Sequence, residues 1–421
     1  MRPVRFVHCA DLHLGTPFAG ISELHPELGQ SLYQSTYASF DNIVSIAIKE
    51  EADCVLIAGD IYDSEDKSLQ AQLRFRSGLI RLSDAGISTF IAYGNHDPLN
   101  GWSATLKWPD EVFAFPGDKV ERVTLKRHDE TLASIYGISF SKRDIKENLA
   151  LRFAPAKESI PRIGLLHANL GTNTGHEPYA PCSIGDLSGA GMDYWALGHV
   201  HQGSIIRPAN PAIVYPGCSQ SRSPRETGPK GCYIVTLESG CDPIIDFVPT
   251  DVVRYVSDII DISTCLSLDE VMESVAKWCT ELAGMSEGRN LIIRLSIRGR
   301  TDLHSQLQRP DSIPDMLASI REQLIAGEPW IWLDRLSLNT AGTYDLESLR
   351  HGNDFIADIV SVFDELEDPE SRNREELGEI SQVLFDKWQG HGYLEELPDE
   401  TLTRLAGEAK ERILDLLLKE N

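Results

Sequence analysis

The chain lacks the features that mark membrane, secreted or thiol-bound metal proteins. None of its eight cysteines forms a CxxC pair, so the sequence offers no thiolate zinc site and no dithiol redox motif. It contains no run of 18 apolar residues, which excludes a predicted membrane span. The short N-terminal apolar run leads directly into Asp11, a candidate ligand that removal of a signal peptide would destroy. We therefore expect a cytoplasmic protein.

Basic residues are also scarce. The 39 Lys and Arg stand against 64 Asp and Glu, which gives a net charge of −25. Nucleic-acid-binding proteins usually present a basic surface, and this composition does not predict one. The deficit is uneven, because residues 346–421 hold 8 basic and 20 acidic residues and so contribute −12. Bound cations would also invert the local field. The composition therefore predicts that the isolated chain binds DNA weakly and that a partner protein provides most of the DNA affinity.

Five short apolar runs each end in a polar cluster of metal-ligand type. A continuous apolar run is typical of a buried strand, and the C-terminal ends of such strands face the crevice of an α/β sheet. Gly59, Gly94 and Gly198 stand just before three of the clusters, where the backbone must turn sharply or approach another group closely. Each motif alone is weak evidence, but together they predict one convergent centre. The clusters are Asp11-Leu12-His13, Gly59-Asp60, Gly94-Asn95-His96-Asp97, His167 and Gly198-His199-Val200-His201.

The ligand types restrict the metal. Imidazoles and carboxylates with one amide and no thiolate suit manganese, iron or zinc better than calcium or magnesium. Two such cations about 3.5–4 Å apart clamp a phosphoryl group during its transfer. One carboxylate must bridge the two cations, and Asp60 is the natural candidate because it stands alone at the end of its strand.

These motifs resemble the five signatures of the calcineurin-like metallophosphoesterases. Their order and spacing are closest to the DNA-repair exonuclease branch, which includes SbcD- and YhaO-type nuclease subunits. The resemblance covers roughly residues 1–250 and extends to Tyr215-Pro216-Gly217 and Lys230-Gly231. It implies an α/β fold, a four-layer α/β/β/α sandwich, with a small α+β cap domain and a C-terminal helical segment. It also implies a centre that uses two divalent cations, with manganese as the expected metal.

The resemblance assigns roles to single residues. One cation falls to Asp11, His13, Asp60 and His201, and the other falls to Asp60, Asn95, His167 and His199. His96 is expected to stabilise the transition state and protonate the leaving 3′ oxygen, and Asp97 is expected to orient the His96 imidazole. Asp63 stands where many archaeal and eukaryotic relatives have histidine, so the role of that histidine is not carried over.

Three regions follow one another along the chain. Residues 1–250 form the expected catalytic domain. Residues 251–345 alternate predicted strands at 259–263, 291–297 and 330–338 with predicted helices at 268–282 and 313–325, the pattern of a small α+β cap. Residues 346–421 show only amphipathic helices. These helices either pack on each other and on the cap or dock onto a partner, and the resemblance implies an SMC-like coiled-coil ATPase.

Two further features stay open. The polar loop 218–231 contains Arg222, Arg225 and Lys230 and is read either as a solvated turn with helper salt bridges or as a phosphate-backbone contact. Arg294, Arg298 and Arg300 on one predicted strand suit DNA contact and plain solvation equally.

The sequence therefore predicts a manganese-dependent hydrolase. We expect a DNA phosphodiesterase with exonuclease and single-strand endonuclease activity in double-strand break repair, which binds DNA and works with the SMC-like ATPase. The resembling family also forms homodimers through the catalytic domain. A small-substrate phosphodiesterase or phosphatase is one alternative, although it needs neither cap nor helical tail. A non-catalytic metal-binding scaffold is the other, although it needs no His96–Asp97 pair.

Overall fold

The computed structural model describes most of the chain and divides it into two compact units. The first unit comprises Met1–Val256 and Ser286–Ile292, and the second comprises Ser257–Met285 and Ile293–Asn421. We keep the division into 1–250, 251–345 and 346–421 as a proposal. The described residues are 2–16, 25–63, 68–101, 104, 106–127, 130–155, 159–171, 179–325, 327–352, 354–368, 370–386 and 399–418.

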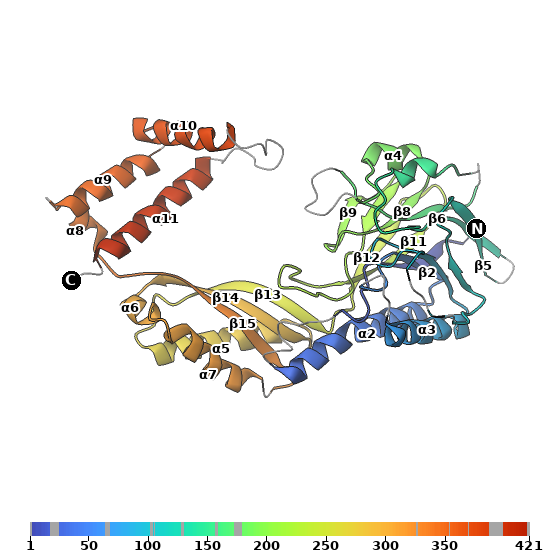
Figure 1. The fold of residues 1–421 in the computed structure, drawn as a ribbon, viewed down its shortest axis with the longest axis horizontal. Coiled ribbons are helices and arrows are strands. Elements are labelled where there is room, and N and C mark those ends of the chain that lie inside the picture. The colour runs from blue at the N-terminus through green and yellow to red at the C-terminus, as the bar shows by residue number, and fades with distance from the viewer. Residues whose placement is uncertain are drawn as a thin grey trace. The chain divides into compact units, whose positions relative to one another are not determined.

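Two six-stranded sheets form the first unit (Figure 1). The strands of the first sheet, in spatial order, are β12 (Ile244–Pro249), β11 (Gly231–Leu237), β1 (Val4–Cys9), β2 (Cys54–Ala58), β3 (Ser88–Ala92) and β4 (Val112–Ala114). Those of the second are β5 (Glu121–Arg127), β6 (Glu130–Ile138), β7 (Arg162–His167), β8 (Tyr194–Gly198), β10 (Ala212–Tyr215) and β9 (Ser204–Arg207).

Parallel pairing brings five strand ends to one edge. In the first sheet β1, β2 and β3 are parallel neighbours, and Ala58 at the end of β2 pairs with Ala92 at the end of β3. In the second sheet β7 and β8 are parallel, and His167 pairs with Gly198. Because parallel strands end at the same edge of a sheet, the residues that follow these five strands can meet.

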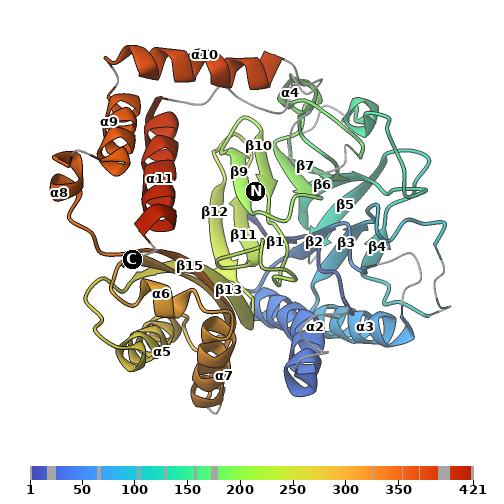
Figure 2. The same ribbon diagram turned by 60° about the vertical axis from the view of Figure 1, so that its left-hand side comes forward.

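Helices cover the outer faces of both sheets. The helices α2 (Pro26–Lys49) and α3 (Leu69–Asp84) pack on the first sheet, where Phe40 and Phe75 join its buried outer face. The short helices η1 (Leu149–Arg152) and α4 (Ile184–Gly189) pack on the second sheet, against Trp195. Figure 2 shows α2 and α3 on one side of the paired sheets and α4 on the other. The predicted α/β/β/α sandwich is confirmed.

The space between the two sheets is a separate apolar core that includes one histidine. Phe6 and Leu56 of the first sheet are buried against residues of the second, and the rings of Phe6 and Tyr194 meet edge to face at 5.2 Å. His8 is fully buried beside them, with Nδ1 3.0 Å from the Tyr194 hydroxyl and Nε2 3.1 Å from the Leu197 carbonyl oxygen. Burial lowers the pKa of His8 to about 3.

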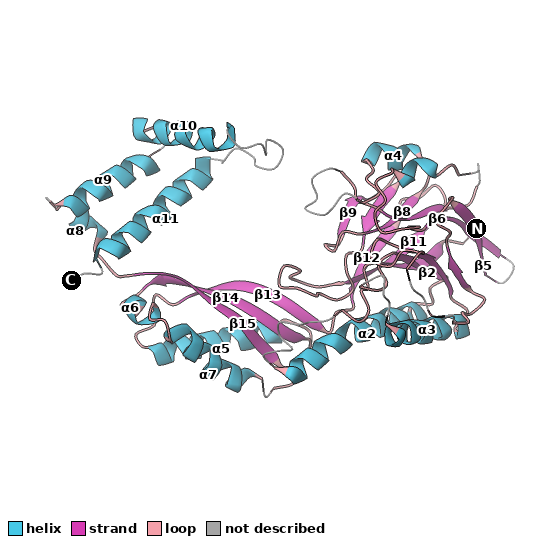
Figure 3. Ribbon diagram, viewed as in Figure 1, coloured by secondary structure: helices cyan, strands magenta, loops and turns pink. Residues whose placement is uncertain are grey.

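Most of a three-stranded sheet belongs to the second unit, and its strands are ordered β13 (Val253–Asp261), β14 (Asn290–Arg300), β15 (Ile331–Ala341). The helices α5 (Leu268–Gly284), α6 (His304–Leu307) and α7 (Ser312–Leu324) accompany it (Figure 3). All three predicted strands and both predicted helices of 251–345 are confirmed, with ends that differ by at most six residues. The three arginines of β14 each have an acidic partner: Arg294 with Asp334, Arg298 with Asp261, and Arg300 with Glu411.

Four helices follow in the same unit: α8 (Leu346–Arg350), α9 (Phe355–Glu367), α10 (Arg372–Asp386) and α11 (Asp399–Leu418). The helix α9 packs against the other three, and α11 also contacts β15. Lys410 of α11 lies 3.2 Å from Asp364 and 2.7 Å from Glu367 of α9. The predicted packing of the helices on each other is therefore present. Some apolar side chains stay exposed, among them Phe355, Val362, Ile380 and Leu416.

The buried His8 predicts a pH-dependent stability. His8 stays neutral in the folded chain but takes up a proton on unfolding once the pH falls below the ordinary pKa of histidine. Acid therefore favours the unfolded state. Between pH 7 and pH 5 this group alone should cost about 2 kcal/mol of unfolding free energy. Urea unfolding at both pH values, in the presence of chelator, should show that loss in the wild type and a smaller loss in His8→Gln. Equal losses in the two proteins would contradict the prediction.

Candidate metal centre

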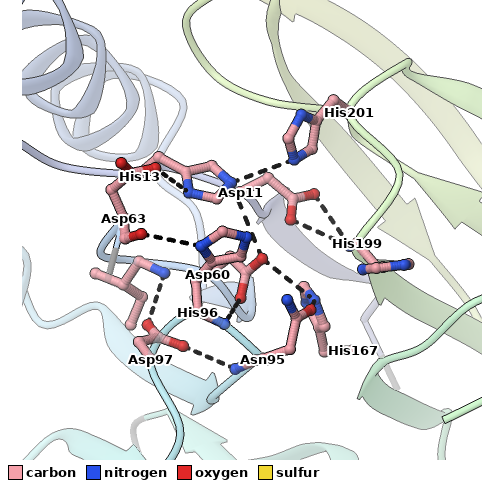
Figure 4. A network of polar contacts seen from close by, with 12 residues as sticks. Asp11, His13, Asp60, Asp63, Asn95, His96, Asp97, His167, His199 and His201 are labelled. Carbon is pink, nitrogen blue, oxygen red and sulfur yellow. Dashed lines mark hydrogen bonds and ion pairs between the residues drawn. The ribbon is translucent and has the colours of Figure 1, made fainter. Parts of the chain in front are cut away.

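The structure brings together the side chains that follow the five strand ends. Asp11 and His13 follow β1, Asp60 follows β2, His167 ends β7, and His199 and His201 follow β8. Asn95, His96 and Asp97 follow β3 and complete the group (Figure 4). All of these residues except His96 and His201 are buried, so most of the centre is shielded from solvent at the edge that both sheets share.

Asp60 lies between the candidate ligands that follow strands of the first sheet and those that belong to the second sheet. Its Oδ2 lies 3.4 Å from Nε2 of His167 in the second sheet and 3.9 Å from Nε2 of His13 in the first. Its Oδ1 accepts a hydrogen bond of 2.9 Å from the backbone N–H of His96. A carboxylate in this place can reach two cations at once, as the sequence predicts for Asp60.

The donor set fits divalent cations. Ligand atoms of Asp11, His13 and His201 lie within 4.8 Å of one another, and so do those of Asp11, Asp60 and His167. The Nε2 atoms of His13 and His201 face each other at 3.2 Å, a separation at which two imidazole nitrogens can share one cation.

The remaining predicted ligands lie close to these groups. Asn95 presents its Oδ1 3.0 Å from Nε2 of His167. The His199 imidazole falls outside both groups, although its ring centre is 5.2 Å from that of His167. A third group, which the sequence did not suggest, joins His13 and His96 with Asp63.

The charges of the centre also favour cations. Burial and the neighbouring Asp60 carboxylate raise the pKa of Asp11 well above its ordinary value. The pKa of Asp60 is lowered, because the imidazoles of His167 and His96 outweigh the opposing effect of burial. Burial lowers the pKa of His13 well below its ordinary value, and it also lowers that of His167 although the Asp60 carboxylate opposes the shift. An imidazole that has lost its proton has a lone pair free to bind a metal. Two buried carboxylates without a nearby cation are costly, and a divalent ion would offset that cost.

Several candidate ligands sit on unusual backbone. Asp11, His13, Asp60 and His199 have φ angles of 50°, 45°, 51° and 106°. Residues with a side chain rarely adopt this left-handed region, and such strain clusters at functional sites. The hydrogen bonds Asp11 N–H to Gly59 O and His13 N–H to Asp60 O, both 3.0 Å, hold the first two turns in place.

The expected close approach at glycines is confirmed at all three strand ends, and a Cβ atom on Gly59 would lie 2.3 Å from Nδ1 of His167. A Cβ atom on Gly94 would lie 2.2 Å from Oδ1 of Asp60, and one on Gly198 would lie 1.8 Å from the carbonyl oxygen of Ala58. All three separations are too short for any side chain. The contact at Gly198 crosses from one sheet to the other, so the absence of a side chain at Gly198 allows the two halves of the centre to meet.

His96 and Asp97 make different kinds of contact. Nδ1 of His96 lies 2.9 Å from the backbone carbonyl oxygen of Asp63. The buried Asp97 carboxylate accepts hydrogen bonds from the backbone N–H groups of Ile61, at 2.7 Å, and Gly94, at 2.8 Å. Asp97 therefore ties the loop after β2 to the loop after β3. Its expected effect on His96 stays a prediction, which these contacts support through the backbone that both loops share.

Two residues of the loop 218–231 reach the centre. Oε1 of Glu226 lies 2.7 Å from Nδ1 of His201, and Nη1 of Arg222 lies 2.5 Å from Oδ1 of Asp63. Although burial opposes the shift, the hydrogen bond with His201 and the charge of Arg222 lower the pKa of Glu226 to about 2. The sequence showed that this loop is charged, but it carried no signal that these two side chains fold back onto the centre.

A two-sheet α/β sandwich with aspartate, histidine and asparagine donors at its shared edge defines a metallophosphoesterase. Residues 4–203 match the calcineurin-like phosphoesterase family, and residues 258–341 match the middle domain of the metallophosphoesterase YhaO. The chain belongs to the calcineurin-like metallophosphoesterases of the YhaO type.

Curated relatives agree with this assignment. The chain is 34% identical over 345 residues to the uncharacterized metallophosphoesterase YhaO of Bacillus subtilis, which covers 82% of this chain and 84% of that protein. It is 29% identical over 264 residues to the DNA double-strand break repair protein Mre11 of Aeropyrum pernix, covering 58% of this chain and 60% of the relative. For the Mre11 protein of Sulfurisphaera tokodaii the identity is 28% over 213 residues, covering 49% and 51%.

The close contact at Gly94 predicts a selective defect. In Gly94→Ala the new methyl group must displace the Asp60 carboxylate, so manganese affinity should fall by at least about tenfold. The overpacking should also cost about 1–3 kcal/mol of unfolding free energy. Isothermal titration calorimetry and urea unfolding measure the two effects. The control is Gly189→Ala, because a Cβ there meets nothing within 4 Å. Unchanged manganese affinity in Gly94→Ala would contradict the assignment of Asp60.

Proposed function

We propose that this chain is a manganese-dependent DNA phosphodiesterase with exonuclease and single-strand endonuclease activity. The observation that carries the proposal is the position of His96. Its backbone N–H donates a hydrogen bond to the central carboxylate of Asp60, and its ring lies beside the candidate ligand His13 and the Asp63 carboxylate. The relatives named for DNA double-strand break repair support DNA as the substrate. The mixed imidazole and carboxylate donors support manganese.

The chemistry divides between cations and side chains. When bound, two divalent cations supply Lewis-acid activation of water and of the phosphate oxygens. Asp11, His13, Asp60 and His201 would hold one, and Asp60, Asn95, His167 and His199 would hold the other.

His96 would supply the proton for the leaving group. A carbonyl oxygen only accepts hydrogen bonds, so Nδ1 of His96 donates to Asp63. This contact fixes the ring and leaves Nε2 as the nitrogen that exchanges a proton with the substrate. A proton on Nε2 would pass to the leaving 3′ oxygen.

We further propose a cytoplasmic nuclease subunit that acts in double-strand break repair with an SMC-like coiled-coil ATPase. The helical segment 346–421 would bind that partner, and the exposed apolar side chains of Phe355 and Val362 on α9 support this role. No helix among the described residues is long and apolar enough to cross a membrane. The proposal also includes a homodimer formed through the catalytic domain.

The proposed function predicts the behaviour of His96→Ala. With manganese, the wild type should degrade linear duplex DNA and nick circular single-stranded DNA. The variant should lose both activities by about 10²–10⁴-fold, because it lacks the proton donor. It should still bind manganese, because His96 is not an expected ligand. Gel assays and calorimetry measure these two properties, and added chelator should abolish cleavage by the wild type.

Two controls separate the alternatives. His351→Ala removes an exposed histidine at the C-terminal end of α8, and this variant should cleave DNA like the wild type. Bis-nitrophenyl phosphate, included as a small diester, reports on the metal centre alone. Turnover of the small diester without cleavage of DNA would overturn the DNA proposal in favour of a small-substrate enzyme. Equal DNA cleavage by His96→Ala and the wild type would show that the activity does not come from this centre.

A further inference from the structure

Two of the candidate ligands are backed by carboxylates. Nδ1 of His201 lies 2.7 Å from Oε1 of Glu226 and forms a hydrogen bond with it, whereas Nδ1 of His13 lies 3.2 Å from Oδ1 of Asp63 without forming a hydrogen bond. The opposite ring nitrogens of these two histidines, both Nε2, face each other at 3.2 Å. Each imidazole thus contacts a carboxylate on one side and points to the same place on the other.

Arg222 connects the two carboxylates. Its guanidinium contacts Asp63 at 2.5 Å, and its backbone N–H donates to Oε2 of Glu226 at 2.6 Å. A second guanidinium nitrogen lies 3.3 Å from Nδ1 and 3.4 Å from Nε2 of His201. The side chains of Arg222 and Glu226 are only 15% and 13% exposed, so solvent screens these contacts weakly.

The loop that carries Arg222 and Glu226 is fixed to the centre by its own backbone. The N–H of Cys218 donates to the carbonyl oxygen of His201 at 3.1 Å, and the hydroxyl of Ser221 donates to the carbonyl oxygen of Glu226 at 2.7 Å. The glutamate therefore reaches His201 from a folded loop rather than from a solvated turn.

His167, one of the two histidines expected at the other cation position, has a neutral partner instead of a carboxylate. Nδ1 of His167 lies 2.8 Å from the backbone carbonyl oxygen of Ala58, which is a neutral acceptor. A carboxylate on the far nitrogen fixes the tautomer of a ligand histidine and raises the basicity of its metal-binding nitrogen more than a neutral carbonyl does. His201, with its carboxylate partner, is therefore supported more strongly than His167.

We propose that Glu226 and Arg222, together with Asp63, are positioning residues for one cation position, the one formed by Asp11, His13, Asp60 and His201. The loop 218–231 would thereby make the two positions unequal in affinity and set the occupancy of the supported one. This inference rests on the proposed two-cation centre. Glu226 is not expected to contact the cation or the substrate.

Glu226→Gln tests the proposal, because it keeps the size and one hydrogen-bonding oxygen of the side chain but removes its charge. Manganese titration of the full chain, followed by calorimetry and by electron paramagnetic resonance of the free ion, gives two dissociation constants. The constant of one ion should rise about 10–100-fold, and that of the other should change less than about threefold. Arg222→Gln should weaken the same ion. Arg225→Gln, the matched change at an exposed residue of the same loop, should weaken neither.

A second background separates positioning from general damage. Glu226 acts through His201, so Glu226→Gln should have no further effect on the ion that remains in His201→Ala. In Asn95→Ala, where the supported position remains, Glu226→Gln should still weaken binding about 10–100-fold. Thermal unfolding of the metal-free variants checks that they fold, and Arg222→Gln carries the test if Glu226→Gln does not.

The outcomes are distinct. Equal weakening of both ions, or of neither, in a folded Glu226→Gln would overturn the inference. A wild type that binds two manganese ions but does not cleave DNA would refute the proposed substrate and leave the inference intact. A wild type that binds no pair of cations would refute both.

Discussion

The close approach of two sheets at one edge is the constraint on which the centre depends. Ala58, at the end of β2, lies against Gly198 at the end of β8, and its carbonyl oxygen also accepts from His167 of β7. Ligands from one sheet can therefore meet ligands from the other around Asp60. The inter-sheet core, with Phe6 and Tyr194 in edge-to-face contact, holds the sheets at this separation. Packing far from the chemistry thus fixes the geometry of the chemistry.

Electrostatics adds a second requirement. Asp11 and Asp60 are both buried, and burial together with the neighbouring Asp60 carboxylate raises the pKa of Asp11 well above its ordinary value. Arg222 is the fixed positive charge nearby, but its guanidinium is paired with Asp63. The buried carboxylates therefore favour the binding of cations. The net charge of −25 is a sum over the whole chain and does not predict the local field at the centre.

The sequence predicted those parts of the molecule that follow from strand periodicity. The apolar runs placed the candidate ligands that follow them at strand ends, and parallel pairing brings these strand ends to one edge. The ligands so placed are Asp11, Asp60, Asn95, His167 and His199. It could not reveal the contacts of Glu226 and Arg222, because a polar loop has no periodicity from which its path can be inferred. Left-handed backbone at Asp11 and Asp60 was equally hidden, since residue type favours glycine there and only tertiary hydrogen bonds impose the conformation.

The carboxylate of Asp97 closes a brace between two loops, through Ile61 on one side and Gly94 on the other. These loops carry the central carboxylate and the asparagine and histidine that follow β3. Their separation is thus set by a bond internal to the protein rather than by the arriving ions. These two loops therefore need not fold around the ions when the centre is loaded.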